Sequence, residues 1–270
     1  MRTTAITLTL ICCAIAACDD SRSDCAKVEE PQRAILACTR VIDSGRESKH
    51  IVALALYNRG VAENNSGNFD DAIVDFSRAA QLKPDYAKTF YNRALAYFTK
   101  GNTDDAIVDF TEALRINPKY QLALSRRAAA ELKKDDFATA ASDATEALAL
   151  NEHDDLAYAT RAAAFYFMKD YERAIADFTE ALRISPGDAK RYVARGWAYL
   201  SVLNWGSGLA DADRAIELSP GNARAYELRA HIYQRIGKTD KAIADLRAAL
   251  RTDPSREELK TALERLGAAP

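Results

Sequence analysis

The fold is decided by one stretch, residues 91–118, which reads YNRALAYFTKGNTDDAIVDFTEALRINP. Its first half carries Arg93, its second half carries the neighbours Asp109 and Phe110, and Pro118 closes it. The same residue types return at steps of 34 residues in both directions. A fixed period held over six copies indicates an array of repeated supersecondary units rather than an ordinary globular domain.

Two charged positions keep this period through all six copies. They are the arginines Arg59, Arg93, Arg127, Arg161, Arg195 and Arg229, and the aspartates Asp75, Asp109, Asp143, Asp177, Asp211 and Asp245. A catalytic group would occur once, whereas a structural bracket recurs in every unit. We therefore interpret each arginine as the ion-pair partner of an aspartate, across a helix pair or in the neighbouring unit. A ladder of exposed arginines that binds a polyanion is the functional alternative, and the sequence leaves it open.

Each unit predicts two helices joined by a tight turn. Within residues 87–120, apolar residues recur at spacings of three and four in two separate segments, which is the pattern of an amphipathic helix. Gly101-Asn102 lies between the segments and tolerates the left-handed backbone of a helix end. Asn117-Pro118 ends the second segment, because proline disfavours the helical conformation in the residue before it. The stripe residues are Phe90, Ala94 and Tyr97, followed by Ala106, Phe110 and Ala113.

This order of large, small and aromatic residues with a closing proline resembles the tetratricopeptide repeat (TPR). The resemblance implies an all-α, right-handed α-solenoid of helix-turn-helix units. Six 34-residue units are expected at 53–86, 87–120, 121–154, 155–188, 189–222 and 223–256. The unit at 121–154 departs most, with Glu131, Ala144 and Glu152 where the family has two aromatic residues and a proline. We expect this unit to pack most weakly, because alanine removes a large buried side chain.

Residues 257–270 predict a C-terminal capping helix and tail. Leu259, Leu263 and Leu266 share one face of the expected helix, which would cover the open apolar end of the array. Ser255 and Glu258 have the spacing of a capping box, a pattern that satisfies free backbone donors at a helix start.

The first 17 residues predict a cleaved export signal. An apolar run at 6–17 is shorter than the roughly 20 residues that a membrane-spanning helix needs. The run ends at Ile15-Ala16-Ala17-Cys18, which resembles the lipobox of bacterial lipoproteins, so we expect a lipidated Cys18 and a periplasmic, membrane-anchored chain. Two alternatives remain, namely conventional cleavage near Ala14-Ile15-Ala16 and a cytoplasmic protein with an apolar start.

Beside the candidate anchor Cys18, two cysteines remain in the mature fold, and export allows them to join. In the repeat register, Cys25 and Cys38 fall on the two helices of a truncated unit. Residues 18–52 are therefore expected to form the anchor segment and a disulfide-linked N-terminal half-repeat. The alternative is a pair of free, buried thiols.

Several function classes are disfavoured by composition and motifs. The chain has 37 basic and 39 acidic residues, a net charge of −2, which argues against a nucleic-acid partner. His50, His153 and His231 are far apart in the sequence, so no metal site is expected. Phosphate-loop, nucleophile-elbow and zinc-protease motifs are absent from the sequence. We expect no cofactor and no enzymatic activity.

In the TPR family, the first helices of successive units line a concave groove that takes partner segments. The resemblance places six candidate contact residues on this groove, namely Lys88, Tyr91, Asn92, Phe98, Arg126 and Trp197. Asn92 and Arg126 match two places of the family's carboxylate clamp, whereas Tyr57, Val61 and Leu122 replace its other members. Lys88, Asn92 and Arg126 form a hypothetical site for a partner's carboxylate. An ordinary solvated groove wall is the alternative.

These patterns together predict a non-catalytic protein–protein interaction scaffold or adaptor at the bacterial cell envelope. It would bind peptide-like segments in the groove and touch the membrane only through its lipid. One alternative is a fixed structural subunit of an envelope assembly or secretion machine, which would co-purify in fixed stoichiometry. Another is an accessory regulator of an envelope hydrolase or protease. The sequence indicates no particular partner and no oligomeric state.

Overall fold

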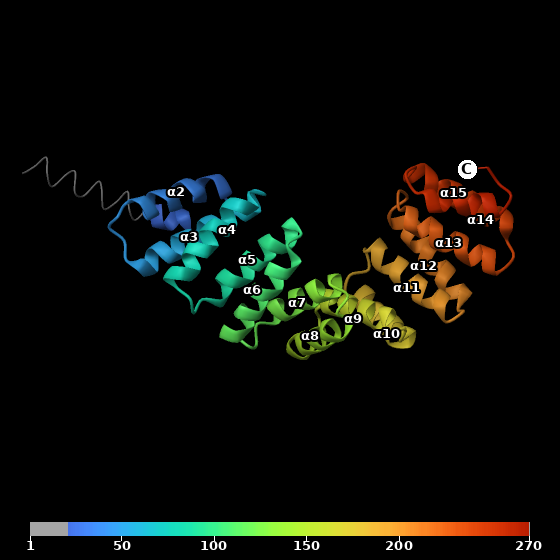
Figure 1. The fold of residues 1–270 in the computed structure, drawn as a ribbon, viewed down its shortest axis with the longest axis horizontal. Coiled ribbons are helices and arrows are strands. Elements are labelled where there is room, and N and C mark those ends of the chain that lie inside the picture. Colours follow the sequence, from blue (N-terminus) through green and yellow to red (C-terminus); the bar gives the residue numbers. More distant parts are fainter. Residues whose placement is uncertain (1–20, 270) are drawn as a thin grey trace, which may run out of the picture. The chain divides into compact units, whose positions relative to one another are not determined.

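The computed structural model describes residues 21–269, and every regular element among them is a helix. The helices follow one another in pairs of similar length (Figure 1). The all-α repeat architecture predicted from the 34-residue period is thus confirmed. The bounds are α2 Pro31–Asp43, α3 Lys49–Asn65, α4 Phe69–Leu82, α5 Ala87–Lys100, α6 Thr103–Ile116, α7 Gln121–Lys133, α8 Phe137–Leu150, α9 Asp155–Phe167, α10 Tyr171–Ile184, α11 Ala189–Ser201, α12 Trp205–Leu218, α13 Ala223–Arg235, α14 Thr239–Thr252 and α15 Glu257–Arg265.

The chain divides into two compact units. Unit 1 ends at Ala130 and unit 2 begins at Glu131, so the division falls inside α7 and inside the segment 121–154. The expected signal sequence and the candidate lipidation site Cys18 lie outside the described residues. Between residues 21 and 269, no helix combines the length and the apolar character that a bilayer crossing requires.

The turns inside the helix pairs use a left-handed residue at one fixed place. Gly101 ends α5 with a φ of 90°, as the Gly-Asn pattern predicts. In three of the helix pairs, a residue that carries a side chain adopts this same left-handed conformation. The sequence patterns did not predict this. They are Asp135, Lys169 and Leu203, with φ values of 61°, 65° and 60°. A Cβ atom makes this conformation unfavourable by about 1 kcal/mol or more, so these three turns are strained.

Each helix pair packs small residues against large ones. In unit 1, Phe76 and Phe110 are fully buried beside Ala72 and Ala106. A Cβ atom on Gly60 would lie 2.8 Å from the ring of Phe76, so the absence of a side chain there sets how closely α3 and α4 approach. The close approach explains why the sequence repeats small residues beside each aromatic one.

The N-terminal half-repeat is held by a disulfide and a longer helix. The structure joins Cys25 and Cys38 with an S–S distance of 2.09 Å, and both residues are buried. They pack with Ala37, Val41 and Ala55. Helix α3 has 17 residues where α5 has 14, which accommodates the extra residues of this first unit. Its start is capped by Ser48, whose hydroxyl accepts a hydrogen bond from the Ile51 N–H at 3.3 Å.

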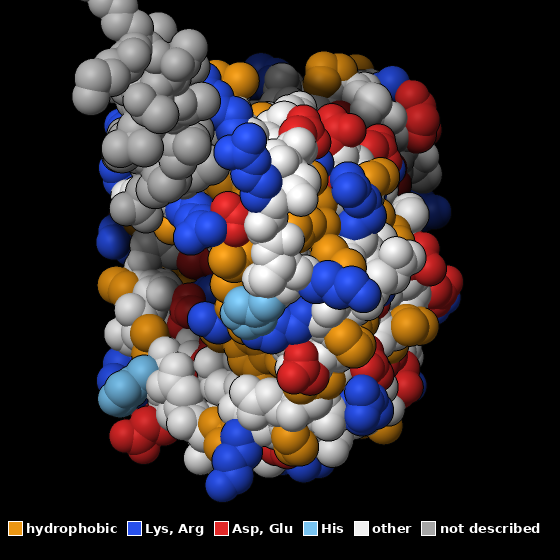
Figure 2. Space-filling model, turned by 90° about the vertical axis from the view of Figure 1, so that its left-hand side faces the viewer, with side chains coloured by type: hydrophobic (Ala, Val, Ile, Leu, Met, Phe, Trp, Pro, Cys, Tyr) orange, Lys and Arg blue, Asp and Glu red, His pale blue; other side chains and the backbone are white. Residues whose placement is uncertain are grey.

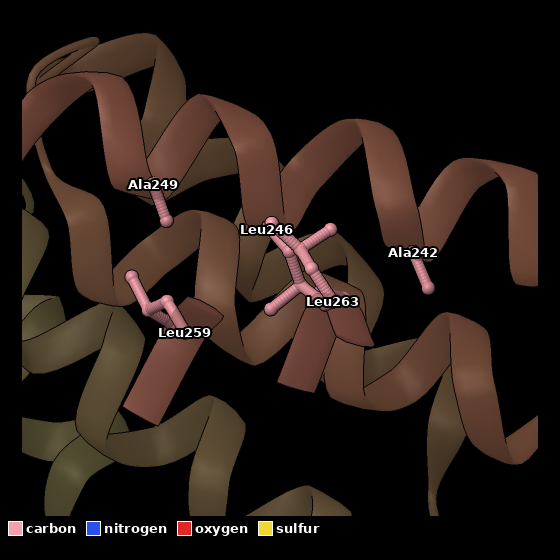
Figure 3. Packing of buried hydrophobic residues seen from close by; sticks show 6 residues of the cluster. Ala242, Leu246, Ala249, Leu259 and Leu263 are labelled. Carbon is pink, nitrogen blue, oxygen red and sulfur yellow. The ribbon is translucent and has the colours of Figure 1, made fainter. Parts of the chain in front are cut away.

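The C-terminal end of the array is covered by α15. Figure 3 shows Leu259 and Leu263 of this helix directed at Leu246 and Ala249 of α14, and all four are buried. The capping-box prediction was wrong. The helix begins at Glu257 after Arg256, without a side-chain cap, because the Ser255 hydroxyl donates to Asp253 Oδ1 at 2.6 Å instead.

Candidate functional site

The recurring arginines and aspartates form bidentate pairs. In each, the guanidinium donates through Nε and Nη2 to both carboxylate oxygens of the aspartate 16 residues later, on the second helix of the same pair. The pairs within the two units are Arg59–Asp75, Arg93–Asp109, Arg161–Asp177, Arg195–Asp211 and Arg229–Asp245. Arg127 belongs to unit 1, and Asp143 is a buried residue of unit 2.

Each of these arginines also reaches back to the preceding helix pair. The second partner is a hydroxyl group 16 residues earlier, or 20 earlier for Arg59, for example Ser77 for Arg93 at 3.0 Å. The partners are Thr39, Ser77, Thr111, Thr145 and Thr179, and the last arginine, Arg229, binds Asp213 at 2.6 Å instead. These hydroxyls were not predicted from the sequence, although they recur near the same period.

Burial and bidentate geometry favour a structural interpretation of the lattice. The paired arginine side chains are only 16–22% exposed. Hydrogen bonding to aspartate raises the pKa of Arg93 above its ordinary value, so the guanidinium stays charged and committed to its neighbours. Little of it is free to meet a polyanion.

In unit 1, the structure corrects two of the candidate contact residues. Tyr91 is buried, with 8% of its surface exposed, and packs its ring 5.9 Å from Phe110 and 4.9 Å from Tyr120. It is a core residue and not an exposed anchor. The Asn92 amide nitrogen donates to the Tyr57 hydroxyl at 3.1 Å and to the Lys88 carbonyl at 2.9 Å. Both amide hydrogens are thus used, so Asn92 has no donor left for a partner's carboxylate.

The other unit 1 candidates remain accessible. Lys88 and Arg126 are exposed and Phe98 is half-buried. Within residues 21–269 neither the Lys88 ammonium nor the Arg126 guanidinium forms an ion pair. Of the three residues proposed for the carboxylate site, only Lys88 and Arg126 therefore remain available to a partner.

Unit 2 contains a pocket of about 1200 Å³ along the first helices of three successive pairs, α9, α11 and α13. Its floor is aromatic and includes Tyr166 and Phe167 at the end of α9 and Trp197 in the middle of α11. Phe167 is 56% exposed, yet its ring stacks on Phe137 with centroids 4.9 Å apart. A large, exposed and laterally supported ring in a concave site is a typical contact for an apolar side chain.

Beside the aromatic floor, the pocket is lined by an ion-pair cluster that was not predicted from the sequence. Arg191 of α11 donates to Asp155 of α9 at 2.6 Å and lies 3.2 Å from Asp188. Ser185 donates a further hydrogen bond to Asp155 at 2.7 Å. Burial raises the pKa of Asp155, but the bonds from Ser185 and Arg191 outweigh it and hold the pKa below the ordinary value. This cluster ties α9 to α11, and both carboxylates share the one guanidinium of Arg191.

Trp197 is supported from α13 by His231. Their ring centroids lie 5.2 Å apart in an edge-on arrangement. Burial lowers the pKa of His231, so the ring that meets the indole is neutral near pH 7. The support behind Trp197 is therefore uncharged near pH 7.

Other site classes find no support in the described part of the chain. No group of three or more histidine, cysteine or acidic residues between 21 and 269 is placed to hold a metal ion. On the face shown in Figure 2, basic and acidic side chains are interspersed, and hydrophobic ones show as small separate patches. That face therefore presents no broad field of one sign.

Comparisons with known families agree with the repeat geometry. Sequence models described as tetratricopeptide repeat match residues 87–120, 155–188 and 223–256, and one described as TPR repeat matches residues 60–101. Tetratricopeptide repeats are thus recognised in both units of the chain. No curated protein sequence matches it.

Solved structures with the same fold include three of different origin. A tetratricopeptide repeat protein from Parabacteroides merdae has 21% identity and a TM-score of 0.66, covering 93% of this chain and 99% of its own. YrrB, described as a TPR protein with an unusual peptide-binding site, has 21% identity and a TM-score of 0.59, covering 70% and 95%. The anaphase-promoting complex assembly Cut9–Hcn1 has 18% identity and a TM-score of 0.69. That match covers 87% of this chain, which spans only 48% of the matched one. At these identities the likeness shows the fold alone.

Proposed function

We propose that this chain is a non-catalytic adaptor that binds a segment of a partner protein in the unit 2 pocket. The observation that carries the proposal is the combination of an aromatic floor, Phe167 and Trp197, with a concave volume of about 1200 Å³. Pockets of this size and lining hold peptide segments by burying one or two large side chains. A peptide-binding site is described for YrrB, so the fold is able to carry one.

Preorganisation supports the same proposal. The pocket walls come from three helices, of which α9 and α11 are joined by the Arg191–Asp155 pair. The Arg195–Asp211 and Arg229–Asp245 pairs hold α11 and α13 against the second helices of their own pairs. A site that is already ordered spends less conformational entropy when a partner binds. The free cations Lys88 and Arg126 give unit 1 a second contact surface for the same or another partner.

The adaptor proposal is tested by comparing the proteins that co-purify with the full chain and with a pocket variant. Phe167→Ala/Trp197→Ala removes the floor, and Leu203→Ala is the matched control because Leu203 is 67% exposed and does not line the pocket. We expect a defined partner with the wild-type chain and the control, and its loss from the double variant. An identical set of captured proteins from all three chains would refute the proposal.

We further propose that the adaptor works at the cell envelope, exported and held by a lipid on Cys18. The apolar run and lipobox-like residues before Cys18 support this location, and the Cys25–Cys38 disulfide fits an oxidising compartment. The substitution Cys18→Ser should move the chain from the membrane pellet to the soluble fraction. A variant that stays in the pellet would contradict the lipid anchor without touching the pocket proposal.

A further inference from the structure

The unit 2 pocket combines its aromatic floor with cations that have no internal partner. Resting on the proposed function, we propose that the segment it binds is acidic, with aspartate or glutamate beside a large apolar side chain. The apolar side chain would lie on Trp197 and Phe167. The acidic side chains would lie at the edge formed by the first turns of α11 and α13.

The two acidic residues of the pocket wall already have an ion-pair partner within the chain. Asp155 and Asp188 share Arg191, at 2.6 Å and 3.2 Å. One oxygen of Asp188 also caps α11 by accepting hydrogen bonds from the N–H groups of Lys190 and Arg191 at 2.9 Å and 3.3 Å. Both carboxylates are thus engaged by donors of the chain itself, and neither is left unpaired for a basic ligand.

A third acidic group, on the first helix of the last pair, also has an internal ion-pair partner. Glu227 of α13 accepts two hydrogen bonds from the guanidinium of Arg256, at 2.9 Å and 3.1 Å. Arg256 also donates through Nε to Glu258 at 2.6 Å, so the group of three keeps one negative charge. Glu227 itself does not line the pocket, and both of its oxygens are engaged by Arg256.

Two basic side chains at the pocket edge have no ion-pair partner among residues 21–269. Lys190 and Arg224 both line the pocket, both are exposed, and they hold the same place in successive repeats, 34 residues apart. No carboxylate between residues 21 and 269 lies within ion-pair distance of either side chain. The equivalent place on α9 is Leu156, so the basic edge is confined to α11 and α13.

The charged side chains that line the pocket determine whether it favours an acidic or a basic ligand. Among the residues that line the pocket, Arg191 offsets one of the two carboxylates, Asp155 and Asp188, and Lys190 with Arg224 offsets the other and leaves one positive charge in excess. Cations next to a low-dielectric aromatic floor attract carboxylates more strongly than cations on a flat surface would. A basic segment would bring its own charge against Lys190 and Arg224 without a free acid to meet it. A purely apolar segment would fill the floor but leave this edge unused.

The test selects random 12-residue peptides for binding to the purified full chain and measures the dissociation constants of the enriched peptides by fluorescence anisotropy. We expect enriched peptides with a net negative charge and at least one aromatic or large aliphatic residue. Lys190→Glu/Arg224→Glu should weaken their binding by at least about tenfold, with a reduced dependence on salt. The control Lys238→Glu/Arg251→Glu makes the same charge change at exposed positions outside the pocket and should leave binding unchanged.

The outcomes separate this inference from the proposed function. Enriched peptides that are neutral or basic, yet lose binding on Trp197→Ala, would overturn the acidic ligand and leave the pocket as the binding site. The same conclusion follows if acidic peptides bind the charge-reversed chain as well as the wild type. If no enriched peptide depends on Trp197, the pocket is not the site and both proposals fail. The milder Lys190→Gln/Arg224→Gln variant, checked by circular dichroism, serves if charge reversal disturbs folding.

Discussion

Arg93 and Asp109, on the two helices of one pair, are joined by two parallel hydrogen bonds of 2.7 Å each, and the same guanidinium donates to Ser77 of the preceding pair at 3.0 Å. One side chain thus ties its own helix pair together and ties that pair to its neighbour. In a solenoid, stability is the sum of the stabilities of the units and of their interfaces, and this residue contributes to both.

Removal of one carboxylate from the lattice should destabilise the array. Asp109→Ala leaves the mostly buried Arg93 guanidinium without its partner, and breaking a pair of this kind costs about 3 kcal/mol. The free energy of unfolding in urea measures the loss. The control Glu112→Ala removes the partner of the exposed Arg115 and should cause no measurable change. Equal effects of the two substitutions would show that burial of the lattice pair is irrelevant.

Relief of a strained turn should raise the free energy of unfolding. Leu203 has a φ of 60° and is 67% exposed, so Leu203→Gly removes strain while losing little burial. We expect unfolding to require about 1 kcal/mol more. The reciprocal substitution Gly101→Ala, at a φ of 90° with open space around the new Cβ, should destabilise by about the same amount. Thermal unfolding of both variants tests the prediction, and a destabilised Leu203→Gly chain would contradict it.

Alkaline pH should weaken unit 1 through the half-buried Tyr57. Burial raises the pKa of Tyr57 from 10.0 to about 12. The folded chain therefore holds this proton more tightly than the unfolded one. The resulting stability is fully present below pH 10 and is lost as the pH rises to about 12. Unfolding free energies at several pH values should fall less steeply in Tyr57→Phe. Equal slopes for the two chains would show that the phenol is not protected.

The disulfide should stabilise the N-terminal half-repeat locally. The Cys25–Cys38 bond closes a loop with a sequence separation of 13, and a loop of this size contributes about 3 kcal/mol in the chain-entropy description. Cys25→Ser/Cys38→Ser should therefore increase hydrogen exchange in α2 while α14, at the far end of the sequence, keeps its protection. Unchanged exchange in α2 would mean that packing against Ala55 and Val41 holds this segment without the bond.

The fold was predictable because its determinants are periodic. Six copies of an arginine, an aspartate and a small-large alternation identify helix pairs without any knowledge of long-range contacts. Local details without a period were missed. Leu203 and Lys169 adopt a glycine conformation because the repeat geometry imposes the turn on whatever residue occupies it. The competition of Asp253 for the Ser255 hydroxyl is likewise invisible in a capping-box pattern.

The candidate site was predictable only in part. The position of Trp197 on the inner face follows from the repeat register, and the structure places it in the pocket. Burial of Tyr91 depends on Phe110 and Tyr120, whose rings meet it only in the folded chain. The Arg191–Asp155 pair joins residues 36 apart that do not recur in other units, so no periodic signal reveals it.

The most direct measurement is photo-crosslinking in living cells, with p-benzoylphenylalanine in place of Phe167 on the pocket floor or of Leu203 on an exposed turn outside it. The account predicts a discrete protein adduct from position 167 that disappears when Trp197→Ala is added, and no such adduct from position 203. No adduct from position 167, or the same adduct from both positions, would contradict the claim that the pocket along α9, α11 and α13 receives a partner protein.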